Sequence, residues 1–221
     1  MRIFSVSSHE RPPTLTTAPD CTPAKGEILV RNLACGLNFA DLLMMRGKYQ
    51  DTPALPFTLG MEVAGVVETL GPDTDGPAPG TRVAVFGGSG GLADLGTYPA
   101  DRTVPLPDAV DDITAAALQI AYGTSHVALD HKARLQPGET LVVLGAAGGV
   151  GLTAVELGHL MGATVVAIAR GAEKLEIARA AGADHLIDAE DPDIRGRLKA
   201  LGGADVVYDA VGGDLFRAAF R

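Results

Sequence analysis

Among its 221 residues the sequence has no tryptophan, few tyrosines and phenylalanines, and only two cysteines. Cys21 and Cys35 are too few for a disulfide framework or for a cysteine-rich zinc lobe. No uninterrupted apolar run approaches the ~20 residues of a membrane span, and the first residues lack an apolar segment of signal-peptide length. The sequence therefore predicts a cytoplasmic protein without a membrane partner.

Positive charge is also scarce, because 18 Lys and Arg residues stand against 27 Asp and Glu residues, for a formal net charge of −9. Such a chain repels phosphate backbones, which argues against a nucleic-acid partner and favours a small molecule. Hydrophobic residues make up 47% of the chain, and 28 residues are glycine. This composition is typical of an α/β protein with tight turns between its strands and helices.

The pattern divides the chain into two predicted domains, 1–120 and 121–221. The first contains short β-type runs broken by Pro and Gly, as at 27–32, 62–68 and 81–86, and is predicted to form an antiparallel, barrel-like domain. Residues 38–46 lack Gly and Pro and predict one or two helical turns. Residues 71–80 predict a surface loop.

The second domain alternates apolar strands with Ala-rich helices, which is the pattern of a parallel sheet built from βαβ units. Strands are predicted at 140–145, 164–169, 185–187 and 205–209, and helices at about 149–161, 172–181 and 193–201. These elements predict four strands of a doubly wound sheet.

A glycine cluster, GAAGGVG at 145–151, lies between the first of these strands and a helix. Glycines allow a sharp turn and a close approach of the backbone to a pyrophosphate, which then accepts hydrogen bonds from free N–H groups at the helix start. Because the strand and the helix flank the cluster as required, we expect it to bind a dinucleotide through Gly145, Ala146, Gly148, Gly149 and Val150. The alternative is a merely structural turn.

Arg170 stands about 19 residues beyond Gly151, where an NAD-specific fold carries an Asp or Glu for the ribose 2′-hydroxyl, and Lys174 follows. Two cations cannot accept that hydrogen bond but neutralise a 2′-phosphate, so the pair favours NADPH over NADH. The alternative is a solvated basic turn at a helix start.

Five segments together resemble a known family: NFADLL at 38–43, RGKYQ at 46–50, LGMEVAGVV at 59–67, GAAGGVG at 145–151 and DVVYDAVGG at 205–213. In this order they resemble the zinc-independent quinone oxidoreductase branch of the medium-chain dehydrogenases/reductases, and some also resemble its vesicle amine transport protein branch. The resemblance implies a GroES-like, β-barrel-type catalytic domain followed by a partial Rossmann domain that binds NADPH.

Zinc-dependent relatives place a catalytic Cys where Asn38 stands, a His where Met61 stands and a third ligand, another Cys, in the second domain. An amide and a thioether do not replace a thiolate and an imidazole as zinc ligands, so we expect no metal. Without a Lewis acid, the acceptors that suit the hydride are quinones and α,β-unsaturated carbonyls, which spread the arriving charge. Glu62 is then expected to anchor local structure.

The resemblance also implies roles for individual residues. It assigns Asn38 to the nicotinamide or substrate, Tyr49 to the mouth of the substrate pocket, Tyr122 and Thr124 to the cleft between domains, and Val211 to the cofactor. Tyr49 has a hydroxyl that can donate to a developing oxyanion. The alternatives are that Tyr49 closes a loop and that Tyr122 is a packing residue. Asp41, Asp209 and Glu62 are expected to be structural hydrogen-bond acceptors.

Family members usually continue for about a hundred residues beyond this chain, and the dimer that they form uses that region. The leading prediction is an NADPH-dependent reductase of quinones or enones. One alternative is a fragment of a longer reductase, which the resemblance implies forms a homodimer when complete. A catalytically idle nucleotide-binding protein with a sensing or interaction role is the main alternative, and a zinc alcohol dehydrogenase is a third.

Overall fold

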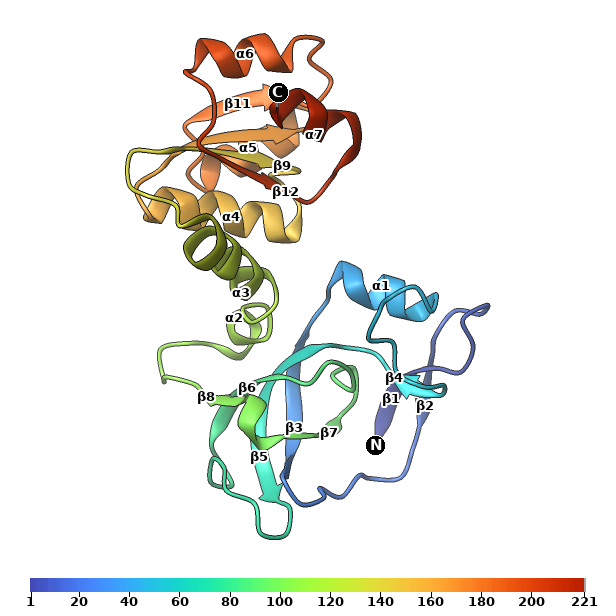
Figure 1. Cartoon of the computed structure of the whole chain (residues 1–221). Helices are drawn as coiled ribbons and strands as arrows, with labels where there is room; N and C mark the ends of the chain where they lie inside the picture. The colour runs from blue at the N-terminus through green and yellow to red at the C-terminus, as the bar shows by residue number, and fades with distance from the viewer. Residues whose placement is uncertain (221) are drawn as a thin grey trace. The chain divides into compact units, whose positions relative to one another are not determined.

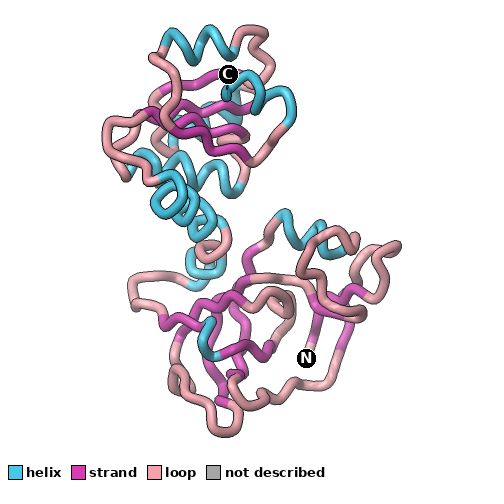
Figure 2. Tube along the Cα trace, in the orientation of Figure 1, coloured by secondary structure: helices cyan, strands magenta, loops and turns pink. Residues whose placement is uncertain are grey.

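The computed structural model describes residues 1–220, which fold as two compact units, Met1–Ile120 and a second unit from Ala121 onward. Figure 1 shows the path of the chain, and Figure 2 shows that strands dominate the first unit, whereas the second alternates helices and strands. Each unit has its own buried core. No helix within residues 1–220 is long and apolar enough to cross a bilayer.

A five-stranded antiparallel sheet forms most of the first unit, in the order β7-β3-β5-β6-β8. Alternate residues of its strands point to a common core that contains Ile28, Val30, Val63 and Val85, with Tyr98 almost fully buried among them. The bounds are β3 (Glu27–Gly36), β5 (Glu62–Leu70), β6 (Arg82–Phe86), β7 (Leu95–Pro99) and β8 (Thr103–Pro105), with a 3₁₀ turn at Ala100–Arg102. The predicted strands at 27–32, 62–68 and 81–86 are confirmed, although the first two are longer.

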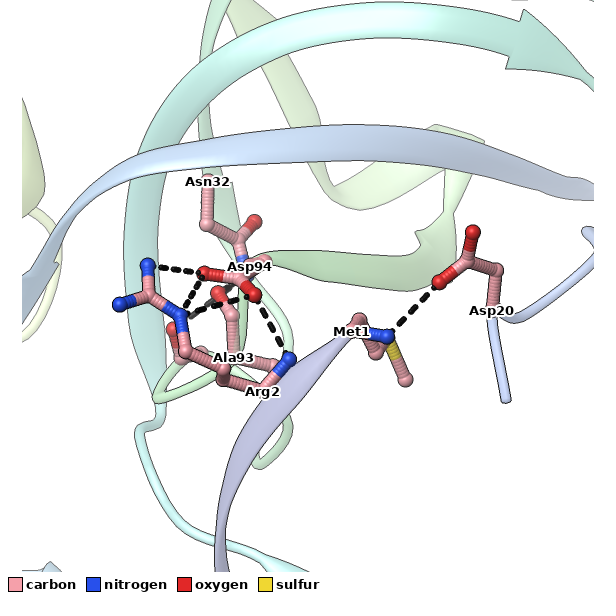
Figure 3. Close-up of polar contacts among 7 residues, drawn as sticks. Met1, Arg2, Asp20, Asn32, Ala93 and Asp94 are labelled. Carbon is pink, nitrogen blue, oxygen red and sulfur yellow. Dashed lines mark hydrogen bonds and ion pairs between the residues drawn. The ribbon is translucent and has the colours of Figure 1, made fainter. Parts of the chain in front are cut away.

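A second, three-stranded sheet has the order β2-β1-β4, formed by β2 (Thr14–Thr17), β1 (Arg2–Val6) and β4 (Phe57–Thr58). The Arg2 guanidinium lies 2.8 Å from the Asp94 carboxylate, and the amino group of Met1 lies 2.9 Å from Asp20 (Figure 3). The contact of Arg2 fastens the first strand to the loop that precedes β7, and the contact of Met1 fastens the N-terminus to the segment that follows β2.

Two short helices complete the first unit. The predicted helix at 38–46 is confirmed as α1 (Phe39–Met45), which buries Met44 against Leu59 and Met61. A further helix, α2 (Asp112–Ala116), was not predicted. It begins at Asp111, whose carboxylate accepts hydrogen bonds from the N–H groups of Ile113 and Thr114, as an N-cap does.

The second unit contains a parallel sheet in the order β11-β10-β9-β12. Its strands are β9 (Thr140–Leu144), β10 (Thr164–Ala169), β11 (His185–Asp188) and β12 (Val206–Asp209). All four lie within one residue of the predicted strands, because each predicted run is apolar and ends at a turn.

Helices cover both faces of this sheet, so the doubly wound arrangement is confirmed. Leu141 and Val143 point to one face, against α4 (Gly149–Leu160) and α5 (Ala172–Ala180). Val142 and Leu144 point to the other, against α6 (Ile194–Ala200) and α7 (Gly213–Phe220). The unit begins with α3 (Ala121–His126) and a π-helical turn at Val127–Ala133, neither of which was predicted.

Candidate functional site

The carboxyl edge of the parallel sheet collects the residues singled out in the second half of the sequence. Gly145 follows β9, Arg170 follows β10, and Val211 lies two residues beyond the end of β12. In a parallel sheet these strand ends lie on one side, which is where open α/β sheets bind their ligands. The structure therefore brings these three positions to one edge.

The glycine cluster turns sharply at Gly145, which has a φ of +71°. The N–H groups of Gly145 and Ala146 donate to the carbonyl of Ile168 at 3.0 and 3.1 Å, which fastens the turn to β10. The N–H of Gly148 donates to the carbonyl of Gly145 at 2.9 Å. The turn is thus closed by its own backbone.

Helix α4 approaches this turn so closely that one position excludes a side chain. A Cβ added at Gly151 would lie 2.2 Å from the carbonyl oxygen of Gly145. Gly148 and Gly149, in contrast, are exposed, and a Cβ at Gly149 would meet nothing within 4 Å. No side chain caps the helix start at Gly148. An exposed, uncapped helix start beside a glycine turn is the geometry that a pyrophosphate group requires.

A buried group of hydroxyls supports this helix start from behind. The Ser125 hydroxyl, from α3, donates to the carbonyl of Val150 at 2.8 Å and lies 2.8 Å from the Thr153 hydroxyl and 3.1 Å from that of Tyr208. Ser125 is fully buried. This network is not evident from the amino-acid sequence, because a lone serine in an unassigned segment carries no pattern.

Arg170 and Lys174 lie at the start of α5, both exposed. The Arg170 guanidinium lies 3.2 Å from the Glu190 carboxylate, and the two side chains are 76% and 70% exposed. An ion pair this exposed is weak. Glu190 was not predicted as part of this region, and it partly neutralises the cation that the sequence assigns to a 2′-phosphate.

Val211 lies directly beside the glycine turn, since its Cγ2 is 2.8 Å from the position that a Cβ at Gly145 would take. Its own N–H donates to the Asp209 carboxylate at 2.8 Å, and the N–H of Gly212 donates to the same carboxylate at 2.9 Å. The expectation that Asp209 is a structural acceptor is therefore confirmed.

Tyr122 and Thr124 lie on α3. The Tyr122 hydroxyl donates a very short hydrogen bond to the Glu156 carboxylate of α4, and this bond, followed by partial burial, raises the pKa of Tyr122. Thr124 is exposed. Glu156 was not predicted from the sequence. The Tyr122 hydroxyl uses its hydrogen for this bond to Glu156, which belongs to the same unit.

In the first unit, Asn38 immediately precedes α1 and is held by a carboxylate. Its side-chain Nδ2 donates to Oε1 of Glu62 at 2.8 Å, and the other oxygen, Oε2, accepts from the N–H of Ile120 at 2.9 Å. Glu62 is only 2% exposed. The expected anchoring role of Glu62 is confirmed.

Asp41 fixes the backbone at the same place. Its carboxylate accepts hydrogen bonds from the N–H of Asn38 at 2.8 Å and from the N–H of Gly60 at 3.1 Å. Burial raises the pKa of Asp41, although the two N–H donors oppose that shift. Asp41 is thus a structural acceptor, as expected.

The two other positions of interest belong to the apolar cluster under α1. Met61 is 4% exposed and packs with Met44 and Leu59, so its thioether is part of the core. Tyr49 is half-buried against the same cluster, and its carbonyl accepts from the Thr52 hydroxyl at 2.6 Å. Among residues 1–220, no three His, Cys, Asp or Glu side chains converge as a metal site.

Comparisons with known proteins agree with both halves of this architecture. A family described as the alcohol dehydrogenase GroES-like domain matches residues 24–108, and one described as zinc-binding dehydrogenase matches residues 149–221. The solved quinone oxidoreductase of Thermus thermophilus, also described in complex with NADPH, is 34% identical with a TM-score of 0.87, over 99% of this chain and 69% of that one. The chain belongs to the quinone oxidoreductase branch of the medium-chain dehydrogenases/reductases. The predicted fold class, a GroES-like domain followed by a Rossmann-type parallel sheet, is confirmed.

Curated relatives of this quinone oxidoreductase-like chain extend further than it does. It is 41% identical to quinone oxidoreductase-like protein 2 homolog of Nematostella vectensis, over 85% of this chain and 53% of that protein. It is 38% identical to the human synaptic vesicle membrane protein VAT-1 homolog, over 86% and 49%. The chain thus spans about half the length of these relatives. A solved NAD-dependent alcohol dehydrogenase also matches, with a TM-score of 0.92 and 27% identity over 99% of this chain and 73% of that one.

Proposed function

We propose that the protein is an NADPH-dependent reductase that delivers hydride to a quinone or an α,β-unsaturated carbonyl without zinc. The observation that carries the proposal is the exposed, uncapped start of α4 beside the turn at Gly145, with Arg170 and Lys174 at the same sheet edge. Two solved neighbours are described as complexes with NADPH.

The residues at this edge fit a dinucleotide. We assign the pyrophosphate to the N–H groups at Gly148, Gly149 and Val150, and contact with the cofactor to Ala146 and Val211. NADPH supplies the hydride when it is bound. The buried network behind Val150 keeps the helix start in place, so that its N–H groups do not reorganise when they meet the anion.

The choice of NADPH over NADH rests on local charge, since NAD-dependent and NADPH-bound relatives share the fold. Arg170 and Lys174 offer two cations and no acceptor for a ribose hydroxyl. Glu190 competes with a 2′-phosphate for Arg170, and because the pair is exposed this competition costs at most ~1 kcal/mol. The net preference therefore remains for the 2′-phosphate.

The proposal of zinc-independent chemistry rests on the side chains that stand at the ligand positions of the zinc enzymes. These side chains are an amide and a thioether, which provide neither a thiolate nor an imidazole. The Asn38 amide is hydrogen-bonded to Glu62, and Met61 is buried in the core. We assign Asn38 to the nicotinamide or the substrate and Tyr49 to the substrate, where its hydroxyl donates to a developing oxyanion. Tyr122 and Thr124 remain candidate cofactor contacts.

The test is a titration of NADPH and NADH into the 221-residue chain, followed by nicotinamide fluorescence, which no tryptophan disturbs. We expect selective binding of NADPH. In the double variant Arg170→Ala/Lys174→Ala, NADPH affinity should fall by ~1.5–3 kcal/mol per charged contact while NADH affinity stays unchanged. Equal loss for both nucleotides would contradict the assignment of the 2′-phosphate.

Two further variants sharpen this test. Arg179→Ala is the matched control, because Arg179 also lies on α5 and is paired with an exposed acid, Glu176, at 3.3 Å. It should leave both affinities unchanged. Glu190→Gln should strengthen NADPH binding by up to about fivefold, because it frees Arg170 for the phosphate.

Turnover then separates the possible functions. Reduction of quinones or enones with NADPH by metal-free protein supports the reductase. Stoichiometric zinc in the purified protein would instead favour an alcohol dehydrogenase. Tight NADPH binding without turnover of any conjugated acceptor would favour a nucleotide-binding protein with a sensing role.

A further inference from the structure

Glu62 is attached to the fold in a way that controls the orientation of one amide. Its carboxylate is buried, and both oxygens accept hydrogen bonds, one from the N–H of Ile120 and one from Nδ2 of Asn38. The carboxylate also packs against Gly36, where an added Cβ would lie 2.6 Å from Oε1 and 2.4 Å from the carbonyl oxygen of Ala116. Glu62 is therefore held by two hydrogen bonds and lies so close to Gly36 that a side chain there would clash with it.

The chemistry of this contact decides which end of the Asn38 amide faces the acid. An ionised carboxylate only accepts hydrogen bonds, so the amide must present its NH₂ group to it. The carbonyl oxygen, Oδ1, is the other branch of the same planar group and points away from Glu62. Asp41 holds the backbone of Asn38 at 2.8 Å, so the side chain starts from a fixed point.

We propose that Glu62 is a positioning residue, which locks the Asn38 amide so that its carbonyl oxygen is offered to the ligand. This rests on the proposed function, in which Asn38 contacts the nicotinamide or the substrate. The consequence is a defined polarity: Asn38 recognises a hydrogen-bond donor, such as the NH₂ of the nicotinamide carboxamide or a hydroxyl group. It does not serve as the donor that stabilises an oxyanion, a role that is left to Tyr49.

The experiment uses Glu62→Gln, which preserves shape but introduces an NH₂ group. Ile120 and Asn38 donate to different oxygens of Glu62, so in glutamine one of these two positions is an NH₂ group. When that NH₂ faces Asn38 it attracts the Asn38 carbonyl oxygen, and the Asn38 amide can turn over. The matched control is Glu68→Gln, on the same strand, where the exposed glutamate pairs with Arg31. Affinities are measured for NADPH and for adenosine 2′,5′-bisphosphate, which keeps the 2′-phosphate and lacks the nicotinamide.

Glu62→Gln should weaken NADPH binding by about fivefold to tenfold and leave the bisphosphate affinity unchanged. Glu68→Gln should change neither. If Glu62→Gln lowers stability in urea but leaves both affinities as they were, or weakens both equally, Glu62 is merely structural and the inference is wrong. Failure of the unmodified chain to bind either nucleotide would refute the proposed function itself, and is thereby distinguished from failure of the inference.

Discussion

Gly149 and Gly151 lie two residues apart in the first turn of helix α4. Substitution of each by alanine should change the stability of the protein in opposite directions. At Gly151, the added Cβ would lie 2.2 Å from the carbonyl oxygen and 2.9 Å from the carbonyl carbon of Gly145. Both are backbone atoms, so the helix or the turn must shift, at a cost of ~1–3 kcal/mol. At Gly149, the added Cβ meets nothing, and Ala has the higher helix propensity, so stability should rise by up to ~0.5–1 kcal/mol.

Urea denaturation of Gly151→Ala and Gly149→Ala measures this difference, with circular dichroism as the signal. We expect the two midpoints to move in opposite directions, with a total separation in the free energy of unfolding of ~1.5–4 kcal/mol. The same two proteins are then titrated with NADPH. Gly149→Ala should bind it about tenfold more weakly although it is the more stable protein, because the methyl group enters the space assigned to the pyrophosphate.

The two halves of this prediction fail separately. Equal stability of both variants would refute the close approach between α4 and Gly145. NADPH affinity at the level of the unmodified chain in Gly149→Ala would refute the assignment of the pyrophosphate to the helix start. Weaker NADPH binding by Gly149→Ala would not be a consequence of lower stability, because this variant is expected to be the more stable of the two.

Two further predictions concern buried polar groups. Ser125→Ala should lower the free energy of unfolding by ~1–3 kcal/mol, because the Tyr208 hydroxyl loses a buried hydrogen-bond partner. The control is Thr124→Ala, at the exposed neighbouring position, which should change the free energy of unfolding by no more than ~0.5 kcal/mol in the same urea assay. Burial raises the pKa of Cys35 to about 12, so about one molecule in ten thousand carries its thiolate at pH 8. Mass spectrometry after iodoacetamide treatment at pH 8 should therefore find Cys21 modified well before Cys35, and faster labelling of Cys35 would contradict the burial of its thiol.

The second unit was readily predicted because its information is local. Each strand is a short apolar run that ends at a turn, and the helix at 149–161 follows a glycine cluster. The segment that forms α2, α3 and the π-helical turn at Val127–Ala133 lacks such contrast. Its helices are short, and their position depends on packing, as where the Tyr122 hydroxyl meets Glu156 on α4. Helices of this length have little intrinsic stability, so sequence pattern alone does not specify them.

The candidate site shows the same division at the level of single side chains. The sequence indicates which residues are chemically suited to a ligand, as with Arg170 and Asn38, but not which acids compensate them. Glu190 reaches Arg170 from the turn after another strand, and Glu62 meets Asn38 from 24 positions away while it also holds Ile120 across 58. In the proposed function these partners compete with or orient the groups that are assigned to the ligand, so we expect them to influence cofactor affinity and the polarity of the contact. On that proposal, the cationic side chains alone set an upper limit on the preference for NADPH, and the acids that the fold places beside them reduce it.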